Sequence, residues 1–215
     1  MSLSPPNGDE ATAPDPEEQS PGIRSRSQSK MTRMFFEWAR IILVAGILAV
    51  GVRAYVARTF FIPSGSMLPT LQIGDRILVD HLPFVLDNIN RGDIVVFGRV
   101  PKDTDPTHPA DLVKRVVGLP GETISSRGDQ ILINGHVLRE PWLPNFNAQP
   151  AADYCGQAAL DIKRTKIAAN SYFVMGDCRG NSLDSRAWGT VPKSLIVGKV
   201  FVVFWRNGHP FIHWF

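Results

Sequence analysis

A serine side chain attacks a carbonyl only when a neighbouring group takes its proton, so a candidate nucleophile must be considered together with its base. The stretch FFIPSGSMLPTL, residues 60–71, places Ser64 and Ser66 on either side of Gly65. Serines next to Gly and Pro are also common turn residues, whose hydroxyls bond nearby backbone groups. The stretch alone therefore indicates either a nucleophile or a turn.

Histidine is the usual base for a serine nucleophile, but the histidines of this chain show no local pattern of a Ser-His-Asp triad. We interpret all five as surface residues in loops or near strand edges: His81, His108, His136, His209 and His213. A serine nucleophile in this chain therefore requires a different base.

Lysine can replace histidine where burial lowers its pKa, because desolvation disfavours the ammonium form. Lys114 lies in the apolar stretch DLVKRVVGLPGE, residues 111–122. In a strand, Lys114 and Arg115 point to opposite faces, so one of them can turn inward while the other stays in water. The alternative for Lys114 is an ordinary edge-strand lysine. Polar stretches hold four other lysines: Lys102, Lys163, Lys166 and Lys193.

A third cluster of polar residues, MGDCRGNSLDSRAWGTVP, runs from Met175 to Pro192. It combines Gly, Asp, Asn, Ser and Arg, the residue types that a hydrogen-bonded loop needs to support a site. An ordinary long turn has the same composition, so the cluster alone leaves both interpretations open.

The elements that must position these residues are predicted to be mostly β-strands. Six short runs are rich in Val, Ile and Phe and are bounded by turn residues, which is typical of strands. The runs are DRILVDHL, GDIVVFGRV, DLVKRVVGL, DQILINGHVL, SYFVMGD and LIVGKVFVVFW. Asn134-Gly135 predicts a two-residue hairpin turn. The aromatics of the terminal FIHWF either close the core or lie against lipid headgroups.

The N-terminal part of the chain differs from the rest. Residues 1–30 are rich in Pro, Ser, Gly and charge, which predicts a disordered cytoplasmic tail. An uninterrupted run of twelve apolar residues follows from Ile41 to Val52. Extended to residues 34–56, this segment is long enough for one transmembrane helix. Glu37 and Arg40 would pair one turn apart at one interface.

Two alternatives to a membrane-spanning helix are a buried core helix and a cleaved secretory signal with Val52 and Ala54 before the cut. Roughly forty residues precede that region and an Arg would lie beside the bond, which favours an uncleaved anchor. Basic residues precede the segment, so the N-terminus is expected in the cytoplasm. Everything after about Arg58 would then lie on the far side.

Composition excludes other classes of protein. The chain of 215 residues has a net charge of +3, and its basic residues flank the apolar segment, so we expect no nucleic-acid partner. Its length fits one sizeable domain or a domain with a small insertion. Cys155 and Cys178 are the only cysteines, and no Cys/His spacing predicts a metal site. They form either one disulfide, in an oxidising compartment, or two unrelated buried thiols.

Four motifs occur in a fixed order behind the N-terminal segment: FIPSGSMLPTLQIGDRILVD, RGDIVVF, KRVVGLPGE and GDCRGNSLDSR. Together they closely resemble the membrane-bound type I signal peptidase (leader peptidase) family, over roughly residues 35–192. The resemblance implies a mainly β fold, in which an antiparallel β-sheet catalytic domain comprises residues 58–122 and 171–215. A small β insertion, residues 123–170, would interrupt it, and the helix 34–56 would precede it.

The resemblance also implies catalytic roles. Ser66 would be the nucleophile and Lys114 its general base, while the Ser64 hydroxyl and the Ser66 backbone N–H would form an oxyanion hole. In an extended segment Ser64 and Ser66 project to the same side, and Gly65 lets the backbone approach a bound carbonyl. One serine can then attack while the other stabilises the oxyanion.

Supporting roles follow from the last motif by the same resemblance. Ser182 would orient Lys114 by hydrogen bonding, and Asp184 with Arg186 would hold the site together as an ion pair. The chain has Cys178 where the family commonly has Asn. A disulfide between Cys155 and Cys178 would clamp the insertion onto this loop.

The implied activity is that of a serine endopeptidase that removes N-terminal signal peptides from secreted preproteins at small-x-small sites. It would use a Ser–Lys dyad, without a metal or any other cofactor. Two apolar pockets are implied. Ile62, Met67, Leu71 and Val113 would line the pocket for the residue before the cut, and Phe60 with Ile77 the pocket two residues further back.

The implied partners are preproteins with signal peptides and membrane lipid. The implied location is the bacterial cytoplasmic membrane, as a single-pass protein with its catalytic domain on the extracytoplasmic side. Three alternative functions are another Ser–Lys protease such as a self-cleaving repressor-like protein, a specialised peptidase for pilus or conjugation substrates, and an inactive membrane-anchored binding domain.

Overall fold

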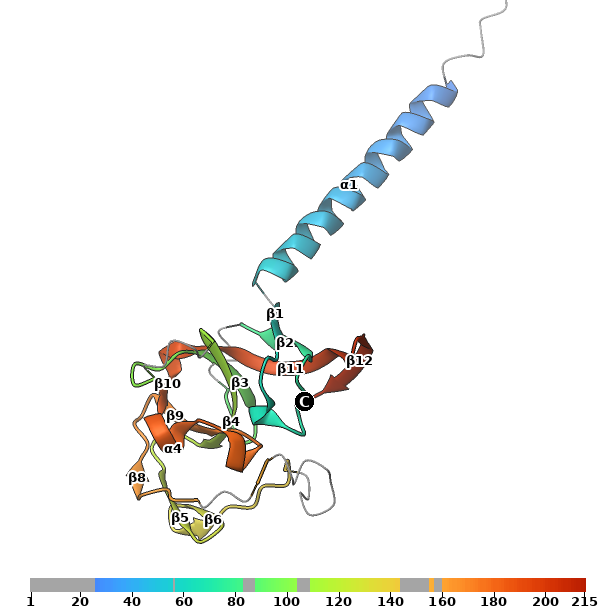
Figure 1. Cartoon of the computed structure of the whole chain (residues 1–215). Coiled ribbons are helices and arrows are strands. Elements are labelled where there is room, and N and C mark those ends of the chain that lie inside the picture. The colour runs from blue at the N-terminus through green and yellow to red at the C-terminus, as the bar shows by residue number, and fades with distance from the viewer. Residues whose placement is uncertain (1–25, 56, 83–87, 104–108, 144–154, 157–159) are drawn as a thin grey trace, which may run out of the picture. The chain divides into compact units, whose positions relative to one another are not determined.

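The computed structural model describes residues 26–55, 57–82, 88–103, 109–143, 155–156 and 160–215 (Figure 1). The chain divides into two units, Met1–Ile47 and Leu48–Phe215. The stretch predicted as a disordered tail lies outside the described residues up to residue 25, and its last residues belong to a helix.

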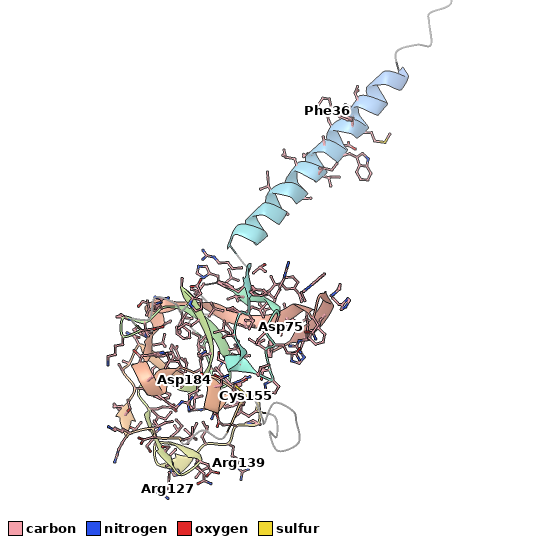
Figure 2. All side chains as sticks on the ribbon, viewed as in Figure 1. Phe36, Asp75, Arg127, Arg139, Cys155 and Asp184 are labelled. Carbon is pink, nitrogen blue, oxygen red and sulfur yellow. A yellow bond between two sulfur atoms is a disulfide. The ribbon has the colours of Figure 1, made fainter. Side chains whose placement is uncertain are left out.

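Helix α1 spans Arg26–Tyr55 and includes the segment in which a helix was predicted, except for Val56, which lies outside the described residues. Between residues 32 and 48 its side chains are exposed, and Phe36 is 70% exposed (Figure 2). Within the described part of the chain, no helix combines the length and hydropathy expected of a membrane span.

The main sheet has eight strands in the order β1-β2-β11-β3-β4-β9-β10, with β12 pairing β11. All pairings in it are antiparallel. The strands are β1 (Ala57–Phe61), β2 (Arg76–Asp80), β3 (Ile94–Gly98), β4 (Asp111–Gly118), β9 (Ser171–Met175), β10 (Val191–Pro192), β11 (Ile196–Arg206) and β12 (His209–Trp214). The expected antiparallel, mainly β fold is thereby confirmed.

Each of the six predicted runs contains a strand, because its β-branched and aromatic residues fit a pleated, buried surface. Strands β1 and β12 were not among the predicted runs. The C-terminal aromatics divide between the two alternatives. Phe211 is half-buried and packs against the apolar cluster that contains Ile62 and Val203, so it helps to close the core. Trp214 is 67% exposed, so the core position is wrong for this side chain.

A second, four-stranded antiparallel sheet has the order β7-β6-β5-β8. Its strands are β5 (Thr123–Arg127), β6 (Gln130–Ile133), β7 (His136–Val137) and β8 (Thr165–Lys166). The predicted hairpin joins β6 to β7, with positive φ angles of 51° at Asn134 and 86° at Gly135. Such angles define the turn that fits strand twist, which explains the Asn-Gly pair.

Apolar clusters cover both faces of the main sheet in its centre. Whether a residue of a central strand points to one cluster or the other depends on its position in the strand. In β3, Val95 and Phe97 belong to one apolar cluster, whereas Ile94 and Val96 belong to another on the opposite face. A strand buried on both faces is continuously apolar rather than alternating. The neighbouring β4 follows the same alternation, so consecutive residues of its DLVKRVVG sequence face different layers.

Candidate active site

Ser66 and Lys114 lie in direct contact although 48 positions separate them in the sequence. Ser66 is the central residue of a short 3-10 turn, Gly65–Met67, that follows β1, and Lys114 is in the middle of β4. Lys114 Nζ donates a hydrogen bond of 2.7 Å to Ser66 Oγ. The Lys114 side chain is buried, with only 4% of the residue exposed.

Burial lowers the pKa of Lys114 from its usual 10.5 to about 8. The nearby charges act in both directions: the carboxylates of Asp184 and Asp177 raise the pKa, and the Arg186 guanidinium lowers it. Desolvation is the largest effect, so a large share of this amine is neutral at mildly alkaline pH. A neutral amine within 2.7 Å of a serine hydroxyl is able to accept its proton.

The loop after β9 holds the backbone of Ser66 in place. Cys178 N–H donates to the Ser66 carbonyl oxygen at 3.1 Å. A Cβ on Gly176 would overlap this same carbonyl oxygen and the Ser182 side chain. Only glycine fits at position 176, because the loop backbone passes directly against the Ser66 peptide.

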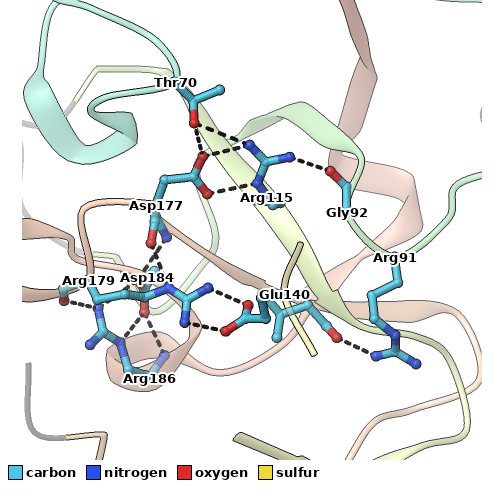
Figure 3. Close-up of polar contacts among 11 residues, drawn as sticks. Thr70, Arg91, Gly92, Arg115, Glu140, Asp177, Arg179, Asp184 and Arg186 are labelled. Carbon is cyan, nitrogen blue, oxygen red and sulfur yellow. Dashed lines mark hydrogen bonds and ion pairs between the residues drawn. The ribbon is translucent and has the colours of Figure 1, made fainter. Parts of the chain in front are cut away.

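A buried ion pair joins the same loop to β4 (Figure 3). Arg115 contacts both carboxylate oxygens of Asp177, at 2.8 and 2.6 Å, and Thr70 Oγ1 donates to Asp177 at 2.6 Å. Arg115 also donates to the Gly92 carbonyl. Lys114 and Arg115 are each only 4% exposed, so the expectation that one of the two stays in water is wrong. The buried charge of Arg115 is compensated because Asp177 pairs with it, on the face of β4 opposite to Lys114.

Asp184 and Arg186 form a second ion pair beside Lys114, with a shortest separation of 2.8 Å. Asp184 caps the short helix α4 (Ser185–Trp188), because its side chain accepts a hydrogen bond from the Arg186 N–H. Gly176 N–H also donates to Asp184, at 3.1 Å. Ser182 Oγ donates to Asp184 at 2.9 Å, so its described partner is this carboxylate. Through Asp184, these contacts connect Gly176 at the start of the loop after β9 with Ser182 near its end.

Two further links join the loop after β9 to residues that follow β7 in the sequence. Cys155 and Cys178 form a disulfide. Arg179 makes two hydrogen bonds with the Glu140 carboxylate, at 2.9 and 2.5 Å (Figure 3). The structure therefore pairs the two cysteines, which is the first of the two possibilities that their sequence positions left open.

Two cavities adjoin the Ser66–Lys114 contact. The larger, of about 390 Å³, is lined by residues that include Ser64, Leu112 and Trp188. The smaller, of about 40 Å³, lies on the side of Val113. Four predicted pocket residues line the smaller cavity: Phe60, Ile62, Met67 and Val113.

The other two predicted pocket residues do not line a described cavity. Leu71 and Ile77 are fully buried and belong to the apolar cluster that contains Ile62 and Met67. They support the lining residues from within the core. Ser64 lies at the border of both cavities, in extended backbone conformation directly before the turn that carries Ser66.

Several contributing residues were quoted within motifs without an assigned role. Asp177 and Thr70 are examples, because a sequence gives no sign of which carboxylate meets which buried arginine. Glu140 lies outside the motifs, and no pattern relates it to Arg179. The GDCRGNSLDSR composition was the only available signal, since it indicated a dense hydrogen-bonding loop.

A serine hydroxyl bonded to a buried lysine of lowered pKa, on an antiparallel β scaffold, is the arrangement that a serine hydrolase without a histidine base requires. A family model described as signal peptidase, peptidase S26, matches residues 35–205. The chain therefore belongs to the signal peptidase family, peptidase S26.

Individual relatives agree with this family. A signal peptidase I of Leptolyngbya laminosa is 37% identical, over 91% of this chain and 92% of its own. Signal peptidase I S of Bacillus subtilis strain 168 is 35% identical, over 85% and 95%. A crystal structure of a signal peptidase I from Enterococcus faecalis V583 is 29% identical, covers 52% and 96%, and has a TM-score of 0.38. The assignment rests on the sequence matches. They confirm the function expected from the sequence, a serine peptidase that removes signal peptides.

Proposed function

We propose that Ser66 is the nucleophile and Lys114 the general base with which this chain removes signal peptides from secreted preproteins. The observation that carries the proposal is the 2.7 Å contact between Lys114 Nζ and Ser66 Oγ, made by a lysine that is only 4% exposed. Burial lowers the pKa of Lys114 to about 8, so the neutral base is accessible near physiological pH.

Catalysis begins when neutral Lys114 accepts the proton of the Ser66 hydroxyl and Ser66 Oγ attacks the scissile carbonyl. The resulting ammonium gives its proton to the leaving amine as the carbon–nitrogen bond breaks. Water then takes the place of the amine, Lys114 accepts a proton from it, and the ester to Ser66 is hydrolysed. Lys114 returns the proton to Ser66 Oγ, which restores both groups.

The oxyanion of each tetrahedral intermediate would be stabilised by the Ser64 hydroxyl and the Ser66 backbone N–H. Support comes from the extended backbone at Ser64 and from its position at the cavity border beside Ser66. Removal of one such donor typically lowers kcat by about 100-fold to 1,000-fold. Asp184 and Arg186 act as positioning residues, since their ion pair lies next to the loop that contacts Ser66.

The preprotein would bind in extended form along the free part of β4. Strand β9 pairs with β4 only from Arg115 onward, so among the described residues no strand pairs with that edge at Asp111–Lys114. An added strand there would form backbone hydrogen bonds that set the register of the cleavage site. Strand β1 ends the sheet order and leads directly to Ser66.

The two unequal cavities account for a small-x-small site. Side chains of an extended peptide alternate between faces, so the residue before the cut and the one two further back point the same way. On the Val113 side these two would meet the cavity of about 40 Å³, which admits small side chains only. The residue between them would face the cavity of about 390 Å³ and is therefore little restricted in size.

Helix α1 would serve as a single-pass anchor in the bacterial cytoplasmic membrane, with its N-terminus in the cytoplasm. Large apolar side chains on all sides of it are at least half exposed, a distribution that suits lipid rather than water. Seven residues separate Arg58 from Ser66, so an anchor that ends near Arg58 keeps the nucleophile close to the outer membrane surface. Signal peptides emerge there.

The deciding experiment compares the wild type with Ser66→Ala and Lys114→Met on a purified preprotein in detergent, with N-terminal sequencing of the product. We expect cleavage after a small-x-small site by the wild type, and at least about 1,000-fold slower cleavage by each variant. Cleavage by Lys114→Met at the wild-type rate would show that another group is the base. Equal inactivity of all three folded proteins on several preproteins would favour a specialised peptidase or a binding domain.

A further inference from the structure

The loop after β9, Gly176–Ser182, contacts Ser66 on one side and the residues at Cys155 on the other. On one side, Cys178 N–H donates to the Ser66 carbonyl at 3.1 Å. On the other side, Cys178 Sγ is bonded to Cys155. A Cβ on Gly180 would overlap the backbone oxygens of Cys155 and Gly156, so the two segments touch along their backbones. One residue, Cys178, therefore carries both the covalent link and the contact with Ser66.

The position of the Ser66 backbone controls two features that matter for the reaction. It determines where Ser66 Oγ lies relative to Lys114 Nζ, and it directs the Ser66 N–H toward the substrate carbonyl. In the described part of the chain, the Ser66 carbonyl is held by the Cys178 N–H. Small displacements of a nucleophile are costly, since a misplacement of about 1 Å lowers a rate by up to about 100-fold.

We propose that the Cys155–Cys178 disulfide is a positioning element for Ser66, so that this peptidase reaches full activity only when the two cysteines are oxidised. The proposal rests on the proposed role of Ser66 as nucleophile. Cys155 and Cys178 touch no reacting atom in it, and they act through the backbone of the nucleophile.

The chemistry of the switch is a thiol–disulfide exchange with a dithiol reductant. The reductant breaks the S–S bond and is oxidised to its own disulfide, while each of the two cysteines gains one electron and one proton as a free thiol. Both cysteines are buried, at 4% and 0% exposure, which shelters the bond. Because disulfides persist outside the cytoplasm, the domain would acquire full activity only after translocation.

Reduction is expected to loosen the loop without unfolding it, because the other links stay. Arg179 keeps its two hydrogen bonds with Glu140, and Asp177 keeps its buried pair with Arg115. Reduction also lowers the stability of the fold, because a disulfide restricts the unfolded chain. The loss of activity should therefore be measured as kcat at temperatures at which the reduced domain is still folded. Water that enters beside Lys114 would also relieve the desolvation that now depresses its pKa.

The experiment measures kcat and KM for preprotein cleavage by the full chain in detergent, below the thermal transition. Four samples are compared: oxidised wild type, wild type treated with dithiothreitol, the double variant Cys155→Ser/Cys178→Ser, and Glu140→Gln. We expect kcat of the reduced wild type and of the double variant to fall by about 10-fold to 100-fold with little change in KM. Dithiothreitol should leave the double variant unaffected.

The pH profile separates a positioning role from a purely structural one. The charged groups that act on Lys114 are Asp184, Asp177 and Arg186. If the loop loosens, the apparent pKa of the kcat profile should move upward from about 8, toward the usual value of 10.5. A variant that is only less stable would keep the wild-type profile at temperatures where it is folded.

Three results would overturn the proposal: wild-type kcat in the double variant, a dithiothreitol effect of equal size on wild type and double variant, or an equal loss of kcat in Glu140→Gln. The last would show that the loss of any one link between the segments lowers kcat, so that the disulfide has no particular role. Inactivity of Ser66→Ala beside an active oxidised wild type confirms the nucleophile independently, so failure of the disulfide proposal leaves the proposed function intact.

Discussion

At the scale of single residues, Lys114 is held in a state that its surroundings make unfavourable for a charge. It is buried in the domain and bonded to a neutral hydroxyl, and the opposite charges of Asp184 and Asp177 compensate only part of the desolvation. Reactivity and stability are therefore opposed at this position. The lowered pKa would make Lys114 available as the proposed base, and the same burial destabilises the folded state whenever the amine is protonated.

Lys114→Met should stabilise the fold at neutral pH although it abolishes activity. Below pH 8 both the folded and the unfolded states bind the proton, so a pKa lowered from 10.5 to about 8 destabilises the wild type by about 3 kcal/mol. Between pH 8 and 10.5 the unfolded chain binds more protons than the folded one, and wild-type stability rises with pH. The advantage of the variant should shrink accordingly.

Denaturant unfolding of both proteins in the same detergent, at pH 7 and pH 9.5, measures this difference. Because α1 is common to the two proteins, its contribution cancels. If the difference in unfolding free energy between the two proteins is the same at both pH values, the pKa of Lys114 is not lowered in the folded state.

At the scale of secondary-structure elements, β4 places two neighbouring cations in different layers. Lys114 faces the cleft and contacts Ser66, and Arg115 faces the opposite layer and pairs with Asp177. One strand thus carries the proposed base and, through the Arg115–Asp177 pair, holds the loop in which Cys178 N–H donates to the Ser66 carbonyl. The neighbouring residues Lys114 and Arg115 therefore position Ser66 together, one through its side chain and the other through the loop.

Arg115→Met should destabilise the domain by about 3–5 kcal/mol, because it leaves the Asp177 carboxylate buried without its partner. Lys199→Met is the matched control. It removes a more exposed ion pair, with Asp93, and should change stability by about 0–1 kcal/mol. Denaturant unfolding checks both values. If the double variant Arg115→Met/Asp177→Leu proves as unstable as Arg115→Met, an unpaired carboxylate is not the cause.

The sequence predicted these elements better than their contacts. The six apolar runs and Asn134-Gly135 predicted strands and a hairpin, because periodicity and turn chemistry are local properties. Ser66 and Lys114 were identified from motifs, and the structure brings them together. The partners of Arg115 and Arg179 were not predicted, since pairing across the fold depends on tertiary packing. Leu71 was expected in a pocket wall from the family resemblance, but it lies in the core. The sequence does not separate the two positions, because apolar lining and apolar core have the same composition.

At the scale of the whole molecule, the catalytic machinery belongs to one unit of the chain. Every residue with a proposed catalytic or binding role lies within Leu48–Phe215, and most of α1 belongs to the other unit. The sheet order starts at β1, which follows the helix in the sequence, and no strand of the described residues precedes it. The helix is thus expected to contribute location rather than chemistry.

A fragment comprising residues 57–215 should therefore fold and cleave a short soluble peptide with a kcat within about threefold of the full chain, since its site is complete. On a preprotein inserted in lipid vesicles it should be slower by about 100-fold or more, because tethering no longer raises the local concentration of enzyme at the membrane. Parallel assays with both substrates, with full-length Ser66→Ala as the blank, measure the two effects separately. A folded fragment that fails on the soluble peptide would mean that α1 takes part in the site, whereas equal rates on vesicles would mean that anchoring does not limit encounter with the substrate.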